Sequence, residues 1–558
     1  MKSVAVAAAL VASLAATGAQ IVTLPHGGKL KGSKGPGFDE YHGVPFAAPP
    51  TGNLRWKSPQ PPSKWNGVRD ASKWGGSCVQ FDSNAQYPNN FPLYEFMSDL
   101  ISPDISKAPY SEDCLYLNVY VPRGGAKNKP VVMFLHGGGL IFGGAAQPVL
   151  DGSFLAATNK DAIIVTANYR LGAFGYLGSS ELAADNTDGS TGNFGWLDQT
   201  AALQWIQDNI GAFGGDPKHV TLWGQSAGAQ SVLWHLIYTN QKAQAAGKPK
   251  LFQQVVMDSP NPPLKPYALA TAQMRFNNMV TSFNCAGASA ADTIACLRSK
   301  TTDDINNYQR DLWTTLYRAN GAGPFAMTVD GAAIPVNAWA KFLAGEYDHD
   351  VKIIIGGNGN EGTGFLREDE PFPSLDAFIA GRFGWIPASY RQQIVDNVYP
   401  NTTLTLRQQK VGVYGDVLFN CPNRYLARKW ASSNPKVWYY KFTEQTNFTN
   451  DTILLGSPHA SELAYFFNHL PALERRDEFL LAYRMSQALL NFVTAGDPNG
   501  AKKNKEDKKR KDNRGNIVWP AYTGTGGSII NFDAQTKIIT DANTNCDFFD
   551  GMYNAILP

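Results

Sequence analysis

Short runs of apolar and β-branched residues recur along this chain, and helix-length segments separate several of them. The runs are VVMF at 131–134, AIIVTANY at 162–169, HVTLW at 219–223, VKIII at 351–355 and VWYYKF at 437–442. Continuous apolar strands are buried on both faces, and their alternation with helices favours parallel pairing. The pattern therefore predicts an α/β fold with a large central, mostly parallel sheet and helices on both faces.

Segment 193–215 shows the helical pattern most clearly, because its apolar residues recur at helical spacing before it ends in glycines. A chain of 558 residues could hold several domains, but the sequence has no internal repeat and no central linker. The strongest linker-like stretch is the basic run at 502–514, which comes too late to divide two domains. We expect one domain over residues 20–558, with 502–514 as a disordered surface loop.

The first residues predict a secreted protein. An early lysine, an apolar stretch to about Ala16 and the small residues after it are typical of a signal peptide over residues 1–19. No later apolar run is long enough to span a membrane, and we find no pattern for a lipid anchor. We expect a soluble extracellular protein, and the glycosylation sequons at Asn401, Asn447 and Asn450 agree with secretion.

The charge balance gives no reason to expect a nucleic-acid partner, because the formal net charge is only +2. Segment 502–514 carries eight Lys or Arg residues against three Asp or Glu residues. It has no aromatic side chain on which a base could stack, so we interpret it as a solvated loop.

Six cysteines in an oxidising compartment allow many pairings. The pairs that we expect are Cys78–Cys114, Cys285–Cys296 and Cys421–Cys546. A metal site is the alternative, but neither CxxC spacing nor clustered histidines accompany these cysteines. The sequence therefore predicts three disulfides, no metal and no cofactor.

The run VTLWGQSAGAQSV at 220–232 breaks from an apolar strand into small residues around Ser226. Gly224 and Gly228 permit a sharp turn before a helix begins, and such a turn pushes the serine side chain outwards as a nucleophile. A tight packing corner with an incidental serine is the alternative, because G-x-S-x-G is a short motif in a glycine-rich chain.

A second strand, VVMFLHGGGLIFGG at 131–144, runs into His136 and three consecutive glycines. An acyl-transfer enzyme needs backbone N–H groups that point at the oxygen on which negative charge develops. We expect Gly138, Gly139 and Ala227 to donate to this oxyanion, with a plain flexible loop as the alternative. We interpret His136 as a support for the loop and not as a base.

A serine hydroxyl needs a base, and a neutral histidine suits this role near pH 7. In α/β enzymes with such an elbow, the chain order is serine, acid, histidine. This order leaves His459 and His469, and it allows His349 only with an acid from 258–348. His459 lies in the small-residue loop GSPHASE and is favoured, whereas His469 resembles the end of a buried helix.

The acid should follow a strand. VKIIIGGNGNEG at 351–362 has this layout, with Glu361 after a glycine-rich turn, whereas Asp330 in TVDGAAIP fits a turn better. Glu361 would fix the tautomer of the imidazole and stabilise the cation that forms when His459 takes a proton.

Taken together, these motifs resemble the type-B carboxylesterase family, which includes lipases, cholinesterases and the non-enzymatic neuroligins. The resemblance covers nearly the whole mature chain and extends to secreted fungal carboxylesterases. Beside the HGGG loop and the elbow, it rests on YHGVPFAAPPTGNLRWKSPQPP (41–62), SEDCLYLNVY (111–120), NYRLGAFGYL (168–177), GNFGWLDQTAALQWIQDNIGAFGGDP (192–217), NEG (360–362) and SPH (457–459).

The resemblance implies an α/β-hydrolase fold, a deep gorge, no metal, and a triad of Ser226, Glu361 and His459. Ser259 matches a family serine that supports the triad histidine. The residue before the nucleophile is often Glu in this family, and Gln225 replaces it here, which removes a negative charge beside the site.

The resemblance also implies two buried ion pairs. Arg55 is expected to pair with Glu112, and Arg170 with Asp416.

The chain also departs from the pattern of the cholinesterases in the family that it resembles, and this departure bears on the substrate class. They hold a cationic group against a tryptophan in the first disulfide loop, and residues 79–113 contain none, although Tyr87, Tyr94 or Phe96 could build a cation–π site. Apolar residues at roughly helical spacing in 89–105 could form a lipase-like lid or a fixed rim helix.

We therefore expect a secreted serine esterase that acts on small uncharged esters by way of an acyl-enzyme. A lipase acting on long-chain acylglycerols at a lipid interface is the main alternative. A cholinesterase, a non-catalytic adhesion or binding protein and a serine protease are weaker ones. The oligomeric state stays open.

Overall fold

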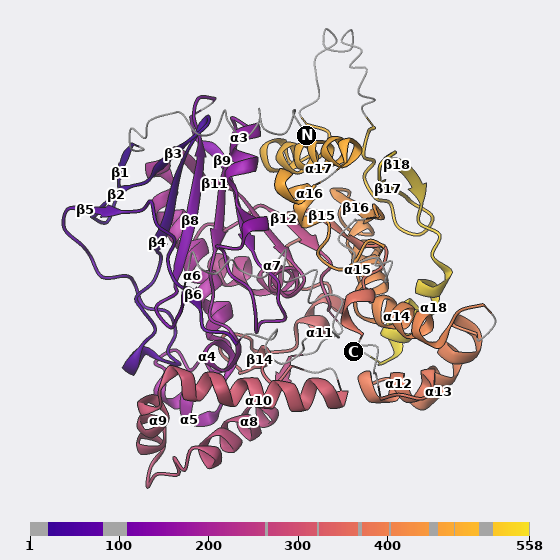
Figure 1. Cartoon of the computed structure of the whole chain (residues 1–558), viewed down its shortest axis with the longest axis horizontal. Coiled ribbons are helices and arrows are strands. Elements are labelled where there is room, and N and C mark those ends of the chain that lie inside the picture. Colours follow the sequence, from indigo (N-terminus) through magenta and orange to yellow (C-terminus); the bar gives the residue numbers. More distant parts are fainter. Residues whose placement is uncertain are drawn as a thin grey trace, which may run out of the picture.

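The computed structural model describes residues 20–81, 109–125, 127–262, 266–320, 323–366, 371–400, 403–445, 456–473, 475–500 and 517–556. Figure 1 shows one sheet crossing the molecule, with helices packed around it. The predicted leader, the segment 89–105, the basic run 502–514 and all three sequons lie outside the described residues.

Within the described residues the central sheet has 11 strands, and its middle is parallel. Their spatial order is β18 (Lys537–Thr540), β17 (Ser528–Phe532), β16 (Val437–Phe442), β15 (Lys352–Asn358), β12 (Gln254–Asp258), β11 (Gly215–Gln225), β9 (Lys129–Leu135), β10 (Ile163–Ala167), β8 (Tyr116–Pro122), β4 (Phe38–Pro45) and β3 (Ser33–Gly35). Pairing is parallel from β17 through β10 and antiparallel outside them. The prediction of a mostly parallel sheet is confirmed.

Shorter strands in the described segments form three small sheets in addition to the central one. They are β1 (Ile21–Thr23), β2 (Lys29–Lys31) and β5 (Val68–Asp70), β6 (Ser77–Cys78) with β7 (Tyr110–Ser111), and β13 (Tyr267–Ala268) with β14 (Thr328–Val329).

Helices occupy most of the connections between the strands of the central sheet. The α-helices are α3 (Ser153–Thr158), α4 (Gly172–Tyr176), α5 (Ser180–Asp185), α6 (Phe194–Asn209), α7 (Ala227–Ala245), α8 (Leu269–Ser282), α9 (Ala290–Ser299), α10 (Thr302–Asn320), α11 (Ala338–Leu343), α12 (Leu375–Arg382), α13 (Ala388–Gln393), α14 (Leu406–Gly415), α15 (Cys421–Ala431), α16 (Leu463–Phe466), α17 (Arg476–Ala495) and α18 (Thr544–Ile556). Short 3₁₀ or π turns are η1 (Gly52–Leu54), η4 (Pro148–Leu150), η5 (Ile210–Phe213), η6 (Thr363–Phe365), η7 (Ile394–Val398), η8 (Asp416–Asn420) and η9 (Leu470–Ala472).

Different helices cover the two faces of the sheet, as the apolar strands predict. Side chains alternate along a strand, so neighbouring residues enter different cores. Leu222 and Val255 pack in one core with α7 and α15, whereas Trp223 and Val256 pack in the other with α16 and α17. We call these the α7 face and the α17 face.

The helix expected over 193–215 is present but ends earlier. The α-helix α6 stops at Asn209, and the 3₁₀ turn η5 continues it to Phe213. Gly214 then takes φ = 82°, a left-handed conformation that terminates the turn, and β11 begins at the next residue. The glycines that end the predicted segment therefore terminate the turn and begin a strand.

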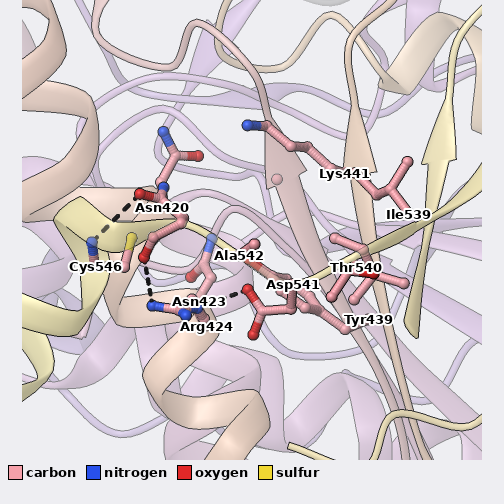
Figure 2. Close-up of a pocket in the computed structure, with 13 residues that line it drawn as sticks. Asn420, Asn423, Arg424, Tyr439, Lys441, Ile539, Thr540, Asp541, Ala542 and Cys546 are labelled. Atoms are coloured by element: carbon pink, nitrogen blue, oxygen red, sulfur yellow. Dashed lines mark hydrogen bonds and ion pairs between the residues drawn. The ribbon is translucent and has the colours of Figure 1, made fainter. Parts of the chain in front are cut away.

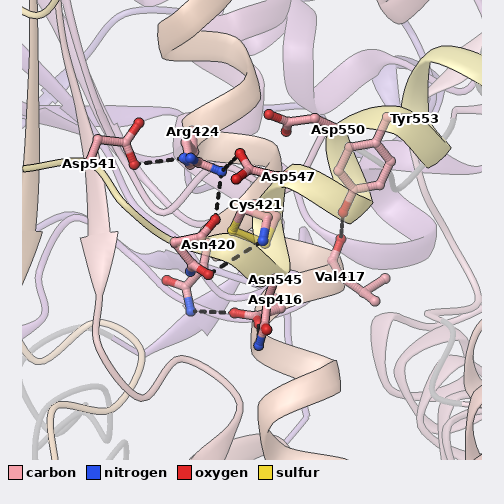
Figure 3. The surroundings of a disulfide bond; sticks show 12 residues. Asp416, Val417, Asn420, Cys421, Arg424, Asp541, Asn545, Asp547, Asp550 and Tyr553 are labelled. Atoms are coloured by element: carbon pink, nitrogen blue, oxygen red, sulfur yellow. Dashed lines mark hydrogen bonds and ion pairs between the residues drawn. A yellow bond between two sulfur atoms is a disulfide. The ribbon is translucent and has the colours of Figure 1, made fainter. Parts of the chain in front are cut away.

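All three expected disulfides are formed. They are Cys78–Cys114, Cys285–Cys296 and Cys421–Cys546. The third joins α15 to the C-terminal helix α18, as Figure 3 shows. Among the described helices, none combines the length and the apolar composition needed to cross a bilayer.

One of the two expected ion pairs is confirmed. The guanidinium of Arg55 donates to both carboxylate oxygens of Glu112, at 2.7 and 2.5 Å, and both side chains are buried. A third nitrogen of Arg55 donates to the carbonyl oxygen of Lys300 at 2.8 Å. The pair therefore also holds the chain between α9 and α10 against the segment that follows η1.

The expected pair of Arg170 with Asp416 is wrong. Arg170 donates through two nitrogens to Asp198 of α6, each at 2.7 Å, and its backbone N–H donates to the same carboxylate at 3.0 Å. Asp416 instead lies beside the Cys421–Cys546 disulfide (Figure 3), where the Tyr399 hydroxyl donates to it at 2.5 Å. Arg170 lies just before α4, and α4 packs against α6. The carboxylate of Asp198 on α6 is therefore the one that Arg170 reaches.

We predict that Asp198→Ala lowers the free energy of unfolding by about 3–5 kcal/mol, because it leaves the buried Arg170 guanidinium without its counter-charge. Asp416→Asn is the matched control, since it changes the carboxylate that Arg170 does not contact. Denaturant unfolding at pH 7 measures both variants. A larger loss in Asp416→Asn than in Asp198→Ala would contradict the assigned pairing.

Candidate active site

Ser226 occupies a strained turn between the end of β11 and the start of α7. Its backbone has φ = 55° and ψ = −121°, a region that residues with a side chain rarely adopt. Its N–H donates to the carbonyl of Asp258 at 2.8 Å, and its own carbonyl accepts from the N–H of Gln230 at 2.8 Å. This geometry is typical of a nucleophile elbow and not of a relaxed packing corner.

The glycines around Ser226 allow three backbone segments to meet. A Cβ on Gly228 would lie 2.1 Å from the carbonyl oxygen of Leu135, and a Cβ on Gly224 would lie 2.5 Å from the carbonyl carbon of Gly228. The first turn of α7 therefore sits directly against the ends of β9 and β11. Side chains at either glycine would force these segments apart.

Glu361 follows the end of β15 and is fully buried. Its Oε1 accepts from the N–H of Asn358 at 2.7 Å and from the hydroxyl of Ser259 at 2.5 Å. Its Oε2 lies 2.5 Å from Nδ1 of His459. The carboxylate is thus fixed by two donors while its second oxygen faces the imidazole.

His459 lies in the loop before α16 and contacts Glu361 and Gln225 through its two ring nitrogens. A carboxylate can only accept, so its contact fixes the proton on Nδ1 and leaves a lone pair on Nε2. The side-chain nitrogen of Gln225 lies 3.2 Å from this Nε2, within donating distance. The rings of Phe365 and Phe419 pack against the imidazole at 5.1 and 4.5 Å between centroids. This tautomer is the one that a general base requires.

The other candidate side chains lie in other environments. Asp330 accepts from the N–H groups of Ala332 and Ile334, at 3.1 and 2.8 Å, and so closes a turn. His469 lies beyond the end of α16 and directly before η9, where burial lowers its pKa, and His349 is exposed and contacts the carbonyl of Gly345.

The glycine loop after β9 lies against the elbow. A Cβ on Gly137 would lie 3.0 Å from the Cβ of Ser226. Gly138 and Gly139 have φ of 100° and 63°, so the loop follows a path that favours glycine. Ala227 is the first residue of α7, and the first N–H groups of a helix have no acceptor within it. The three N–H groups expected to hold an oxyanion thus come from segments that meet at Ser226.

His136 supports this loop. Its ring stacks on Tyr169 with 4.3 Å between centroids, and its Nδ1 lies 2.8 Å from the carbonyl of Gly137. Burial lowers its pKa to about 4, so it is neutral near pH 7.

A cavity of about 330 Å³ lies near Glu361, but it does not open onto the nucleophile. It opens between β16–β18 and the helices α15 and α18, and Figure 2 shows Lys441, Arg424 and Asp541 among its lining residues. The lining includes Gly357 but neither Ser226 nor His459, so this cavity is not the candidate active site.

Sequence reasoning missed two buried carboxyl groups near Glu361. Asp258 ends β12 and Glu462 precedes α16, and both are fully buried. Burial raises the pKa of Asp258 to about 7, and it raises the pKa of Glu462 well above its ordinary value. The signal was an acid at the end of the apolar run QVVMD, which the search for a triad passed over.

Comparison with known proteins gives a consistent result. The model of the carboxylesterase family matches residues 18–549. Acetylcholinesterase from Bungarus fasciatus is 30% identical over 515 residues, which cover 88% of this chain and 79% of that protein. Acetylcholinesterase from Electrophorus electricus is 29% identical over 570 residues, which cover 92% of this chain and 85% of that protein.

We predict that Gly228→Ala destabilises the protein by about 1–3 kcal/mol, because the added methyl group meets the backbone of β9. Gly551→Ala in α18 is the control, since a Cβ there meets nothing within 4 Å and alanine favours a helix. Thermal unfolding should show a lower midpoint for the first variant and an equal or higher one for the second. An unchanged midpoint in Gly228→Ala would contradict the close packing of the elbow.

Proposed function

Because this chain belongs to the carboxylesterase family, whose fold is that of the α/β hydrolases, we propose that it is a secreted serine esterase acting on uncharged carboxylic esters. The observation that carries the proposal is the 2.5 Å contact between Glu361 and Nδ1 of His459, made beside a strained Ser226. Three disulfides and the predicted leader support secretion.

In the acylation step, the hydroxyl of Ser226 attacks the carbonyl carbon of the ester while Nε2 of His459 takes the hydroxyl proton. Negative charge moves to the carbonyl oxygen, which accepts hydrogen bonds from the N–H groups of Gly138, Gly139 and Ala227. The ester bond then breaks, and His459 gives its proton to the departing alkoxide. An acyl group remains on Ser226, and the alcohol leaves.

In the deacylation step, a water molecule attacks the acyl carbon and His459 takes one of its protons. The second tetrahedral intermediate collapses, the proton returns to the oxygen of Ser226, and the carboxylic acid leaves. Glu361 holds the imidazole in the required tautomer and stabilises its cation in both steps. Ser259 fixes Glu361 through its hydroxyl, and the amide of Gln225 must share Nε2 of His459 with the reacting proton.

The surroundings of the site favour an apolar, uncharged substrate. Phe365 and Phe419 pack on the imidazole, and a small core of Phe81, Ile141 and Trp313 adjoins the glycine loop, where Phe142 joins it. Aromatic walls exclude water and accommodate acyl and alkyl groups.

A cholinesterase is the second candidate, because two relatives are acetylcholinesterases and aromatic faces can bind a quaternary ammonium group. The lack of a tryptophan in residues 79–113 argues against it. A lipase is the third, and it depends on the segment 89–105, which lies outside the described residues.

We predict that the native protein hydrolyses p-nitrophenyl acetate and butyrate faster than palmitate, and that Ser226→Ala lowers kcat/KM by about 10⁴-fold or more. We also predict that 3,3-dimethylbutyl acetate, the uncharged isostere of acetylcholine, is cleaved at least as fast as acetylcholine. Initial rates below and above the solubility limit of each ester provide the measurement.

Three other outcomes would each revise the proposal. Rates that rise with chain length and increase sharply on emulsions would make the protein a lipase. A clear preference for acetylcholine over its isostere would make it a cholinesterase. Negligible and equal rates in the native protein and Ser226→Ala would contradict ester hydrolysis itself.

A separate prediction tests the assignment of the acid. Glu361→Gln should lower kcat by about 10³–10⁴-fold, because an amide cannot hold the imidazole in the right tautomer or stabilise its cation. Asp330→Asn should leave kcat within a factor of a few, since Asp330 closes a turn. The same ester assay on both variants decides between them, and the reverse ranking would move the acid to Asp330.

A further inference from the structure

Asp258 lies in a row of residues that crosses four strands of the sheet. Parallel register places Gln225 of β11 beside Asp258 of β12, Asp258 beside Gly356 of β15, and Gly356 beside Tyr440 of β16. Gly356 has no side chain, and a Cβ there would lie 2.3 Å from the ring of Tyr440. The ring of Tyr440 therefore passes over Gly356, and its hydroxyl donates to Oδ1 of Asp258 at 2.8 Å.

The second oxygen of Asp258 is also held. The indole N–H of Trp223, on β11, donates to Oδ2 at 2.5 Å. Asp258 thus receives one hydrogen bond on each oxygen, from strands on either side of its own.

In the part of the chain that the structure describes, the charged groups that face Asp258 are acidic. They are Glu361 from the loop after β15 and Glu462 from the turn before α16, while the elements β11 and β16 contribute Trp223 and Tyr440. Among the described residues, the group that can carry a balancing positive charge in this cluster is His459, which contacts Glu361 directly.

The backbone around Asp258 touches both ends of the candidate triad. Its carbonyl accepts from the N–H of Ser226, and the next residue, Ser259, donates its hydroxyl to Glu361. Ser259 has φ = 54°, and its N–H donates to the carbonyl of Gly356 at 2.8 Å. A shift of Asp258 would therefore move the nucleophile and the acid together.

We propose that Asp258 is a positioning residue for the ester hydrolysis proposed above: clamped by Trp223 and Tyr440, it fixes the elbow, and its carboxylate adds negative charge that stabilises protonated His459. This inference rests on the proposed function. Asp258 acts through its neighbours and does not touch the substrate.

Burial raises the pKa of Asp258 from 3.8 to about 7; the two hydrogen bonds lower it, and the charge of Glu361 raises it further. Between these two values the folded protein holds a proton that the unfolded chain has lost. Stability therefore falls as the pH rises through this window, so ionised Asp258 has a cost to the fold. A carboxylate kept only for structure would stabilise the fold instead.

The experiment replaces the charge and keeps the hydrogen bonds. In Asp258→Asn, the amide oxygen can accept from Trp223, and the amide nitrogen can donate to the hydroxyl oxygen of Tyr440. We predict that the acidic limb of the pH profile of kcat/KM for p-nitrophenyl acetate moves to lower pH by about 0.3–0.5 unit, because protonated His459 loses the stabilising charge of the fraction of Asp258 that is ionised there. We predict that the variant melts above the native protein at pH 8, and that this gain shrinks towards pH 5.

A pair of tyrosines provides the matched control. Tyr440→Phe removes one hydrogen bond from ionised Asp258, so the acidic limb should move in the same direction by a smaller amount. Tyr439→Phe makes the same chemical change one residue away on the α7 face, and it should leave the limb in place.

Two results would overturn the inference. One is an unmoved acidic limb in Asp258→Asn. The other is a melting temperature lowered equally at pH 5 and pH 8, which would make Asp258 a purely structural carboxyl group. Failure of the proposed function is distinguishable, because it would show as an absence of Ser226-dependent hydrolysis in the native protein, while the melting curves would still report on Asp258.

Discussion

The strained backbone of Ser226 is the constraint on which the rest of the site depends. A non-glycine residue at φ = 55° costs on the order of 1–3 kcal/mol and persists only where its surroundings fix it. Here the parallel strands β9, β11 and β12 and the first turn of α7 supply that surrounding, through the hydrogen bond to Asp258 and the close approach permitted by Gly228. The side chain is thus positioned before any substrate arrives, and binding energy is not needed to create the geometry.

Buried negative charge is the second constraint. Glu361, Asp258 and Glu462 form a cluster that contacts His459 through Glu361. Burial raises the pKa of Asp258 and of Glu462. One imidazole cannot neutralise three ionised carboxylates, so protons must remain on part of the cluster near neutral pH. The arrangement opposes folding as the pH rises, yet it favours the cation that His459 becomes during proton transfer. Stability and reactivity therefore respond in opposite directions to the same charges.

The sequence predicted those features that are local in the chain. The strands are visible as apolar runs, and the elbow, the glycine loop and the order of Ser226, Glu361 and His459 each follow from a short motif at a strand end. Interactions that depend on packing between distant segments were harder to predict. Arg170 pairs with Asp198 and not with Asp416 because α4 packs against α6. The spacing of these residues in the sequence does not predict that contact. The role of Asp258 depends on a row across four strands, which only the register of the sheet creates.

Two adjacent glycines of β15 show how closely the strand must approach its neighbours. Gly356 leaves room on the α17 face for the ring of Tyr440 to reach Asp258. Gly357 leaves room on the other side, where a Cβ would lie 2.8 Å from Oε1 of Glu361 and 3.1 Å from the amide of Asn423. A side chain at the first position would displace the clamp on Asp258, and a side chain at the second would displace the acid itself. In the sequence, the two glycines indicate a turn before Glu361. In the fold, both belong to β15, and their lack of a side chain leaves room for Tyr440 on one face and for Glu361 on the other.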